Sequence, residues 1–378
     1  MSTIATQKLT IDARMLKDSG IGVYIQRVLE ELSKADIGFD VLVKSKDADH
    51  VKRTYHGAGT CRVFDANIYS VKELLQLSGE TKGSHMFWSP HYNVPFINHA
   101  SGLKITTIHD VYHLAYYQTL SWKQKLYAKF MLAHAVRSSD LVFTVSHFSK
   151  SEILKFIRCD PEKIHVVHNG VDAGHYRSAR PLDPAKYGTE SPYVLFVGNV
   201  KPHKNLKSAL RGFKIYSETL KKPEDLLDFI IVGKREGFIT GDDEVLQMLE
   251  QPFYRRHVRF TGWVDDEDLP AIYKNAALFV FPSLYEGFGF PPLEAMAAGC
   301  PVISSDAACM PEIYEDAVLY FNPQDENAIA ESMKKVLSDK NLNDALRERG
   351  FDQVKKYNWT EAARSMLDII KTQANRLK

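Results

Sequence analysis

The sequence is poor in features that mark several common protein classes. Its 378 residues include only four cysteines, Cys61, Cys159, Cys300 and Cys309, and no two of them form a C-x-x-C pair. This spacing argues against a zinc site or a redox dithiol and is typical of a reducing compartment. No apolar run is long enough to span a bilayer, and the first residues do not form a secretory signal. We therefore expect a cytoplasmic protein, either soluble or held at the inner face of a membrane.

The sequence also lacks an excess of charge of either sign. Its 48 basic and 47 acidic side chains leave a net charge of +1. A chain with this balance has no global attraction to nucleic acid, so we expect no DNA or RNA partner. A local basic patch that contacts phosphates or an anionic membrane surface is still compatible with this composition.

Short apolar strands alternate with helical patterns along nearly the whole chain. The alternation predicts the α/β class, with parallel sheets covered by helices on both faces. The predicted strands are Leu9–Ala13, Asp40–Val43, Cys61–Asp65, Met86–Trp88, Ile105–His109, Leu141–Val145, Ile164–His168, Tyr193–Val197, Phe229–Val232, Val258–Phe260, Leu278–Phe281, Val302–Ser304 and Val318–Phe321.

The polar, proline-containing stretch Asp172–Pro192 is predicted to link two domains. A hydrophobic content of 44% is sufficient for two cores. We expect two Rossmann-like, doubly wound domains facing a central cleft, over residues 1–180 and 190–357. A C-terminal helix over residues 358–378 is expected to return to the first domain. In such sheets ligands bind beyond the carboxyl ends of the strands, so the chemistry is expected in the loops there.

The strongest local signal is the segment Phe281–Gly299, FPSLYEGFGFPPLEAMAAG. A predicted strand ends at its first residue, a glycine-rich loop follows, and the double proline favours the first turn of a helix. Glu294 is expected in that first turn, with seven residues between it and Glu286 in the loop. A carboxylate accepts two hydrogen bonds at once, which suits vicinal sugar hydroxyls, and nearby backbone N–H groups suit a phosphate. An acidic helix start beside a turn is the structural alternative.

With these residues the sequence resembles glycosyltransferase family 4, retaining enzymes of the GT-B architecture that carry a glutamate, seven residues and a second glutamate in this setting. Further segments occur in the family's order, so the resemblance covers most of the chain: TIHDVYHL, FTVSHFSKSEI, VVHNGVD, VLFVGNVKPHKNL, RFTGWVDDEDLPAIY and VISSD. It implies a nucleotide diphosphate sugar as donor substrate. No further cofactor and no metal ion is expected, because the predicted pocket loops contain no Asp-x-Asp motif.

The resemblance assigns roles to the Glu-x7-Glu segment. Glu294 would hold the ribose hydroxyls of the donor nucleotide, and Glu286 would hydrogen-bond the transferred sugar. The backbone N–H groups of Gly287, Phe288 and Gly289 would reach the sugar or the distal phosphate.

Other residues of the second domain would contact the phosphates and the base. Lys204, at a strand-to-helix turn where it is expected to begin the helix, would neutralise the diphosphate leaving group, with a solvated surface lysine as the alternative. Asn199 stands where the family usually has an arginine. His203, Lys201 and Arg235 are therefore candidates for a second cation. The base would be lined by Gly233, Trp263 and Val264.

In the first domain, Gly20 and Gly22 are predicted to leave a helix N-terminus open to a phosphate. The loop fails the dinucleotide fingerprint, because Ile25 stands where a third glycine would be. His109 ends a strand, and the resemblance implies contact with the donor sugar; a structural histidine is the alternative. Asp110 would orient it or act as a base toward the acceptor. Weaker pocket candidates are His113 and Ser146.

The stretch Ser121–Arg137 mixes aromatic residues with lysines. Peripheral contact with an anionic membrane, where a lipid-linked acceptor would be met, is one interpretation. An ordinary amphipathic helix packed on the sheet is the other, and the one we favour from sequence alone.

Together these features predict a retaining, metal-independent hexosyltransferase of bacterial polysaccharide synthesis. The segments GFGFPPLE and GNVKPHKNL most resemble those of bacterial polysaccharide mannosyltransferases. This resemblance implies GDP-mannose as the donor and a saccharide or lipid-linked oligosaccharide as the acceptor. The alternatives are a UDP-glucose-dependent glucosyltransferase and a non-catalytic nucleotide-sugar binding protein. An epimerase or pyridoxal phosphorylase on the same architecture is disfavoured by the Glu-x7-Glu segment and by the lack of an identifiable Schiff-base lysine.

Overall fold

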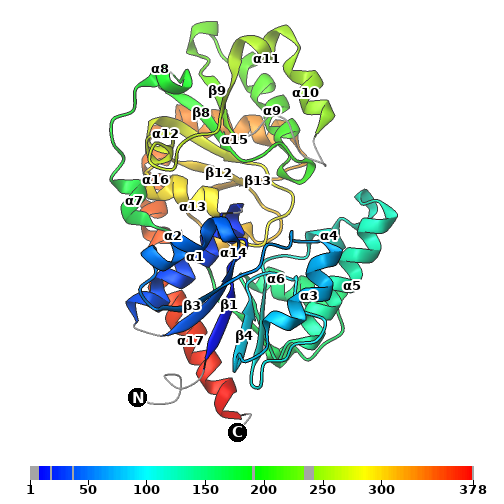
Figure 1. Ribbon diagram of the computed structural model, residues 1–378. Coiled ribbons are helices and arrows are strands. Elements are labelled where there is room, and N and C mark those ends of the chain that lie inside the picture. The colour runs from blue at the N-terminus through cyan, green and yellow to red at the C-terminus, as the bar shows by residue number, and fades with distance from the viewer. Residues whose placement is uncertain (1–7, 18, 36–37, 190–191, 234–241, 377–378) are drawn as a thin grey trace. The chain divides into compact units, whose positions relative to one another are not determined.

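The computed structural model describes residues 8–17, 19–35, 38–189, 192–233 and 242–376. The chain divides into two compact units. The first contains the residues up to Gly170 together with those from Asn358 onward, and the second runs from Val171 to Tyr357. Each unit is a parallel sheet with helices on its faces (Figure 1). No helix within the described residues is long and apolar enough to cross a membrane.

The sheet of the first unit has seven strands in the order β3-β2-β1-β4-β5-β6-β7. Its elements are β1 (Leu9–Asp12), α1 (Ser19–Lys34), β2 (Phe39–Val43), α2 (Ser45–Thr54), β3 (Ala58–Val63), α3 (Val71–Glu80), β4 (Met86–Ser89), β5 (Lys104–Ile108), α4 (Tyr112–Ala115), η1 (Tyr117–Thr119), α5 (Trp122–Ser138), β6 (Leu141–Thr144), α6 (His147–Phe156), η2 (Pro161–Lys163), β7 (Ile164–Val166) and α17 (Trp359–Arg376). The strand order reverses between β1 and β4. This switch point is where a doubly wound sheet opens to a ligand.

The sheet of the second unit has six strands in the order β10-β9-β8-β11-β12-β13, with its switch point between β8 and β11. Its elements are α7 (Ala173–Arg177), α8 (Pro184–Tyr187), β8 (Tyr193–Val197), η3 (Pro202–Lys204), α9 (Leu206–Glu218), η4 (Pro223–Asp225), β9 (Asp228–Val232), α10 (Asp243–Leu249), α11 (Pro252–His257), β10 (Val258–Gly262), α12 (Leu269–Asn275), β11 (Ala276–Phe281), α13 (Phe290–Ala297), β12 (Val302–Ser305), α14 (Met310–Tyr314), β13 (Leu319–Phe321), α15 (Glu326–Ser338) and α16 (Lys340–Val354).

The predicted strands are confirmed, in order and in parallel pairing, because their apolar runs form the two buried sheets. The strand expected at Cys61–Asp65 begins earlier, at Ala58. It lies at the edge of its sheet and its side chains are largely exposed, so it needs no apolar run. The apolar stripe of α1, formed by Ile25, Val28, Leu29 and Leu32, is fully buried.

The segment predicted to be the linker is partly helical. Residues 172–192 contain α7 and α8, and both belong to the second unit, which begins at Val171 rather than beyond residue 180. The α7 helix packs against α12 and α13. Its short length and the single buried side chain, Tyr176, explain why no apolar period was visible in the sequence.

The last helix, α17, belongs to the first unit, where it packs against α1. The ring of Tyr24 lies 6.0 Å from that of Trp359, and the Tyr24 hydroxyl lies 3.5 Å from the sulfur of Met366. A Cβ atom on Gly170 would collide with the backbone of Trp359, so this position requires glycine.

Candidate functional site

Three glycines end adjacent strands of the second sheet. The amide of Gly198, after β8, donates to the carbonyl of Val232 at 2.9 Å, and the amide of Gly233 donates to the carbonyl of Gly262 at 3.2 Å. A Cβ atom on Gly233 would collide with the carbonyl group of Gly198. At the carboxyl edge of the second sheet, backbone without side chains from neighbouring strands therefore lies together. A flat ligand can approach such a surface closely.

Two further predicted base-lining residues follow at the end of β10. Trp263 is 72% exposed, and Val264 is buried. Arg235, a candidate for the second cation, lies outside the described residues.

The loop after β8 is fixed by Asn205, which sequence reasoning missed. Asn205 adopts the left-handed conformation with φ 53°. Its side-chain nitrogen Nδ2 donates hydrogen bonds to the carbonyls of Pro282 at 3.1 Å and Pro323 at 2.8 Å. These bonds tie the loop to the ends of β11 and β13. The expectation that Lys204 begins a helix is wrong, because Asn205 interrupts the helical path: Lys204 ends the 3-10 helix η3 and α9 begins at Leu206.

Lys204 reaches the glycine-rich loop of the Glu-x7-Glu segment. Its Nζ atom lies 2.6 Å from Oε1 of Glu286, and the two side chains are 20% and 14% exposed. The carbonyl of the neighbouring His203 accepts a hydrogen bond from the amide of Leu284 at 2.8 Å. A cation and a carboxylate, both predicted to be functional, are thus held together within one unit and in partial contact with solvent.

Gly289 sets the start of α13. It has φ +82°, and its carbonyl accepts a hydrogen bond from the hydroxyl of Tyr314 at 2.8 Å. A Cβ atom there would collide with that hydroxyl oxygen. Because this turn starts α13 at Phe290, Glu294 is the fifth residue of the helix, and its expected place in the first turn is wrong.

Glu294 is bound by two tyrosines. The hydroxyl of Tyr273 donates to Oε2 of Glu294 at 2.8 Å, and Tyr176 also hydrogen-bonds to this carboxyl. Burial raises the pKa of Glu294 and outweighs these two hydrogen bonds, which lower it. Neither tyrosine could be identified as a site residue from the sequence, since Tyr176 lies in the predicted linker and Tyr273 reads as a core residue of α12.

The other predicted donor residues of the second unit that the structure describes lie on the loops after β8 and β11. Gly287 is buried, and the ring of Phe288 packs 5.2 Å from Phe290 and 5.5 Å from Tyr357. Asn199 and Lys201 are partly exposed in the loop after β8. The structure therefore brings the loop of Lys204 and the loop of Glu286 to one edge of the second sheet.

In the first unit, His109 follows β5 and is largely enclosed. Its Nε2 atom lies 2.9 Å from the carbonyl oxygen of Pro90, so Nε2 carries the proton and donates it. The pKa of His109 is lowered to about 4, chiefly by burial. Nearby His91 also lowers this pKa, and the hydrogen bond to Pro90 opposes the shift. At neutral pH the ring is therefore uncharged, and Nδ1 can accept a hydrogen bond from a hydroxyl.

Asp110 and Ser146 shape the helices beside His109. A carboxylate oxygen of Asp110 accepts a hydrogen bond from the amide of Tyr112 at 2.9 Å, at the start of α4. The buried hydroxyl of Ser146 caps α6 by accepting from the amide of Ser149 at 3.0 Å. The hydroxyl of Ser149 in turn donates to the His109 carbonyl at 3.2 Å. His113 lies in α4, its ring 6.4 Å from that of Tyr92.

The glycines of α1 differ in their surroundings. Gly20 is exposed near the start of the helix, whereas Gly22 is buried. A Cβ atom on Gly22 would lie 2.7 Å from the carbonyl oxygen of Leu16. Gly22 therefore allows the preceding loop to approach the helix closely. Phosphate binding at this helix N-terminus stays a prediction.

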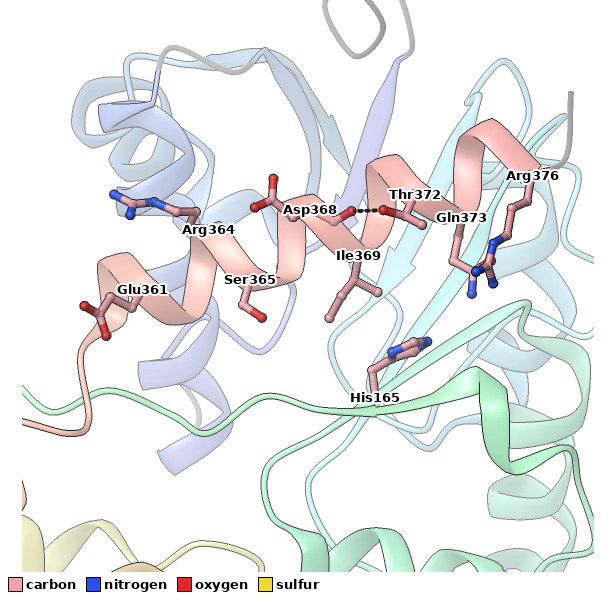
Figure 2. A pocket seen from close by; sticks show the side chains of 9 residues that line it. All are labelled: His165, Glu361, Arg364, Ser365, Asp368, Ile369, Thr372, Gln373 and Arg376. Atoms are coloured by element: carbon pink, nitrogen blue, oxygen red, sulfur yellow. Dashed lines mark hydrogen bonds between the residues drawn. The ribbon is translucent and has the colours of Figure 1, made fainter.

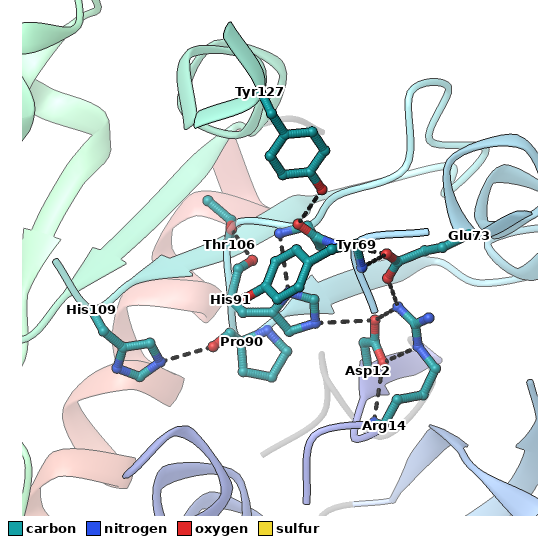
Figure 3. A network of polar contacts seen from close by, with 10 residues as sticks. Asp12, Arg14, Tyr69, Glu73, Pro90, His91, Thr106, His109 and Tyr127 are labelled. Atoms are coloured by element: carbon teal, nitrogen blue, oxygen red, sulfur yellow. Dashed lines mark hydrogen bonds and ion pairs between the residues drawn. The ribbon is translucent and has the colours of Figure 1, made fainter. Parts of the chain in front are cut away.

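A buried charge network lies at the switch point of the first sheet (Figure 3). The guanidinium of Arg14 donates to Asp12 at 2.6 Å and to Glu73 at 2.7 Å, and all three side chains are fully buried. Burial alone would raise the pKa of Asp12, but Arg14 and His91 hold it well below its usual range. A buried cation is tolerable only with such pairing.

The network supports the loop that holds His109. His91 lies 3.4 Å from Asp12, and the amide side chain of Asn93 donates to Glu73 at 2.7 Å. Between β4 and Asn93, the Pro90 carbonyl accepts a hydrogen bond from Nε2 of His109 (Figure 3). The charges therefore fix the orientation of the histidine ring through this loop, an effect that sequence reasoning missed because the partners are far apart in the chain.

A separate hollow of about 510 Å³ lies between β7 and α17 (Figure 2). Its charged lining residues are of both signs, and none of the predicted site residues takes part. The charged lining residues are Arg364, Arg376, Glu361 and Asp368 on α17, and His165 lies on β7.

Comparison with known proteins gives consistent results along the chain. Residues 19–175 match the family model described as Glycosyltransferase Family 4, and residues 181–353 match the one described as Glycosyl transferases group 1. The chain is 29% identical to O-antigen chain mannosyltransferase B of Escherichia coli, over 76% of this chain and 74% of that protein. It is 30% identical to O-antigen chain mannosyltransferase RfbU of Salmonella typhimurium, over 77% and 78%.

Solved structures show the same fold at low identity. Sucrose-phosphate synthase from Thermosynechococcus elongatus superimposes with a TM-score of 0.76 at 18% identity, over 97% of this chain and 98% of that one. Anabaena HepE in complex with UDP-glucose gives 0.74 at 14% identity, over 97% and 99%. The two Rossmann-like domains thus have the GT-B fold.

Proposed function

The chain belongs to the glycosyltransferases that combine a family 4 domain with a group 1 domain. We propose that it transfers mannose from GDP-mannose to a saccharide. We further propose that the transfer retains the anomeric configuration and needs no metal ion. Mannose is supported by the two O-antigen mannosyltransferases, which are about twice as similar in sequence as HepE. UDP-glucose is the second candidate donor, because HepE, with the same fold, was crystallised with it.

One observation carries the proposal: the 2.6 Å contact between Lys204 and Glu286 at the carboxyl edge of the second sheet. A diphosphate at this edge would meet a cation that is held in place by Asn205 and its loop. Glu286 would then accept hydrogen bonds from hydroxyls of the transferred sugar, and Glu294 from the ribose. Fixed groups of this kind stabilise developing charge without reorganising during the reaction.

The proposed reaction breaks the bond between the anomeric carbon and the diphosphate oxygen. An acceptor hydroxyl attacks the same face of the sugar and forms the new glycosidic bond. Its proton passes to the departing phosphate oxygen, so GDP leaves and atoms and charges balance. Lys204 neutralises the charge that grows on the leaving group. Neutral His109 is suited to accept a hydrogen bond from a ligand hydroxyl, and Glu286 orients the sugar rather than attacking it.

The proposed acceptor is a lipid-linked saccharide of bacterial polysaccharide synthesis, at the inner face of the membrane. The names of the two mannosyltransferase relatives support this class. A non-catalytic nucleotide-sugar binding protein remains the alternative outside enzymes, and turnover separates the two.

A donor screen tests the proposal. The full chain is incubated with GDP-mannose, UDP-glucose and ADP-glucose and a soluble mannoside acceptor, with and without EDTA. We expect product from GDP-mannose only, an α-linkage by NMR, and no effect of EDTA. Product from UDP-glucose alone would make it a glucosyltransferase. A β-linkage, or activity lost with EDTA, would refute retention or metal independence, and binding without product would refute an enzyme.

A further inference from the structure

The helix α5 has two apolar faces, and only one of them is covered. Its buried residues pack on the first unit: Ala128, Met131, Leu132, Ala135 and Val136. This packing confirms the expectation that α5 packs an apolar face against its own domain. It accounts for one side of the helix only.

The other side of α5 presents a stripe of large apolar side chains to solvent. Trp122, Leu126 and Phe130 are 71%, 64% and 55% exposed. They follow one another at intervals of four residues, which places them within about 80° on one side of the helix. The ring of Phe130 lies 5.9 Å from that of Phe96, which is 39% exposed, so the stripe continues onto the loop after β4.

Basic residues flank this stripe. Lys123, Lys125, Lys129 and Arg137 lie on α5, and the helix contains no acidic residue. The ammonium group of Lys123 sits 5.6 Å from the ring centroid of Trp122. Since the whole chain carries a net charge of only +1, this is a local concentration of positive charge.

Single exposed apolar residues are ordinary, but an aligned stripe of them marks a contact surface. A protein partner or a second copy is disfavoured by the flanking charges, because lysine is depleted in protein interfaces. An anionic bilayer suits both features. Aromatic and leucine side chains enter the region between headgroups and acyl chains, while lysines meet the lipid phosphates.

We propose that the outer face of α5, defined by Trp122, Leu126 and Phe130 with the flanking lysines, binds the surface of an anionic lipid bilayer. The helix would lie in the plane of the interface. This inference deepens the proposed function by naming the surface that would bring the enzyme to a lipid-linked acceptor. Its test does not depend on the identity of the donor.

Vesicle sedimentation of the full chain tests the inference. The vesicles contain phosphatidylcholine alone or mixed with phosphatidylglycerol. We expect binding to the mixed vesicles only, weakening as salt is added. The triple variant W122S/L126S/F130S should bind at least about tenfold more weakly, and so should K123Q/K125Q/K129Q. The control is Phe156→Ser on α6, which removes a 40% exposed aromatic beside Lys155 and should leave binding unchanged.

The outcomes separate this inference from the proposed function. Wild-type protein that fails to bind the mixed vesicles overturns the inference, whatever its activity. A stripe variant that binds as wild type, or that differs only by losing self-association in sedimentation velocity, also overturns it. The stripe variant should keep its turnover on a soluble acceptor. Vesicle binding without any turnover would support the surface and refute the enzyme.

Discussion

The Nζ atom of Lys204 lies 2.6 Å from Oε1 of Glu286, which joins the loop after β8 to the loop after β11. Each side chain thereby holds the other in position before any ligand arrives. A polyanion at this edge would compete with Glu286 for the lysine and free the carboxylate for hydroxyl groups. The two charges of the candidate site therefore lie on different loops: the Lys204 cation follows β8, and the Glu286 carboxylate, which accepts hydrogen bonds, follows β11.

Replacing Lys204 with methionine should lower kcat by about 10²–10³-fold, because the charge on the leaving group loses its fixed partner. Stability should change little, since both partners are partly exposed. Steady-state kinetics and thermal unfolding measure the two effects. Lys207→Met is the matched control, because Lys207 pairs with Glu244 at 2.8 Å on the surface. Equal loss of kcat in both variants would contradict the proposed role.

Affinity for GDP should fall as the pH is lowered, beginning above the ordinary glutamate value of 4.5, because burial raises the pKa of Glu294. A protonated carboxyl accepts fewer hydrogen bonds from ribose, so each protonation event weakens binding. Calorimetric titration between neutral and acidic pH measures this. Glu294→Gln should bind about tenfold more weakly at neutral pH and show a flatter profile. A variant profile as steep as that of the wild type would exclude Glu294 as its source.

His109 should make the fold less stable under acidic conditions. Its pKa is about 4 in the folded protein, below the ordinary histidine value of 6.5, so the unfolded chain binds the extra proton more readily. The stability from this group is complete above pH 6.5 and is lost as the pH falls toward 4, by up to about 3 kcal/mol. His109→Gln should flatten stability against pH in this window, as measured by urea unfolding. An unchanged slope would mean that His109 titrates normally.

Gly289→Ala should destabilise the protein by roughly 1–3 kcal/mol, because an alanine would be strained at φ +82° and would collide with Tyr314. Gly79→Ala is the control. Gly79 lies in α3 with open space around it, so alanine there should stabilise by about 0.5–1 kcal/mol. Scanning calorimetry of both variants gives the comparison. The interpretation fails if Gly289→Ala unfolds at the wild-type temperature.

The sequence was informative where function depends on neighbours along the chain. The strands can be predicted because each is a short apolar run. The loop-to-helix pattern around Glu286 can be predicted because its residues are contiguous in the chain. The structure then places Lys204 beside Glu286, although they are 82 positions apart. These parts of the site could be predicted because strand-end loops of a parallel sheet meet at one edge.

Contacts that depend on packing could not be predicted. Tyr176 reaches Glu294 from a short helix inside what looked like a linker. Arg14 and Glu73 meet across 59 positions, and only the folded sheet shows that their charges are paired. For α5, residues of similar composition occupy both sides of the helix, so periodicity alone did not reveal which apolar face would remain uncovered.

The return of α17 to the first unit has a consequence for biosynthesis. The tyrosine of α1 that contacts Trp359 and Met366 is translated before the second unit, but both of its partners are translated after that unit. The first unit therefore cannot complete its packing until the second has been fully translated. A nascent chain that stops short should present an unfinished surface to chaperones and proteases, even though most of that unit has already been made.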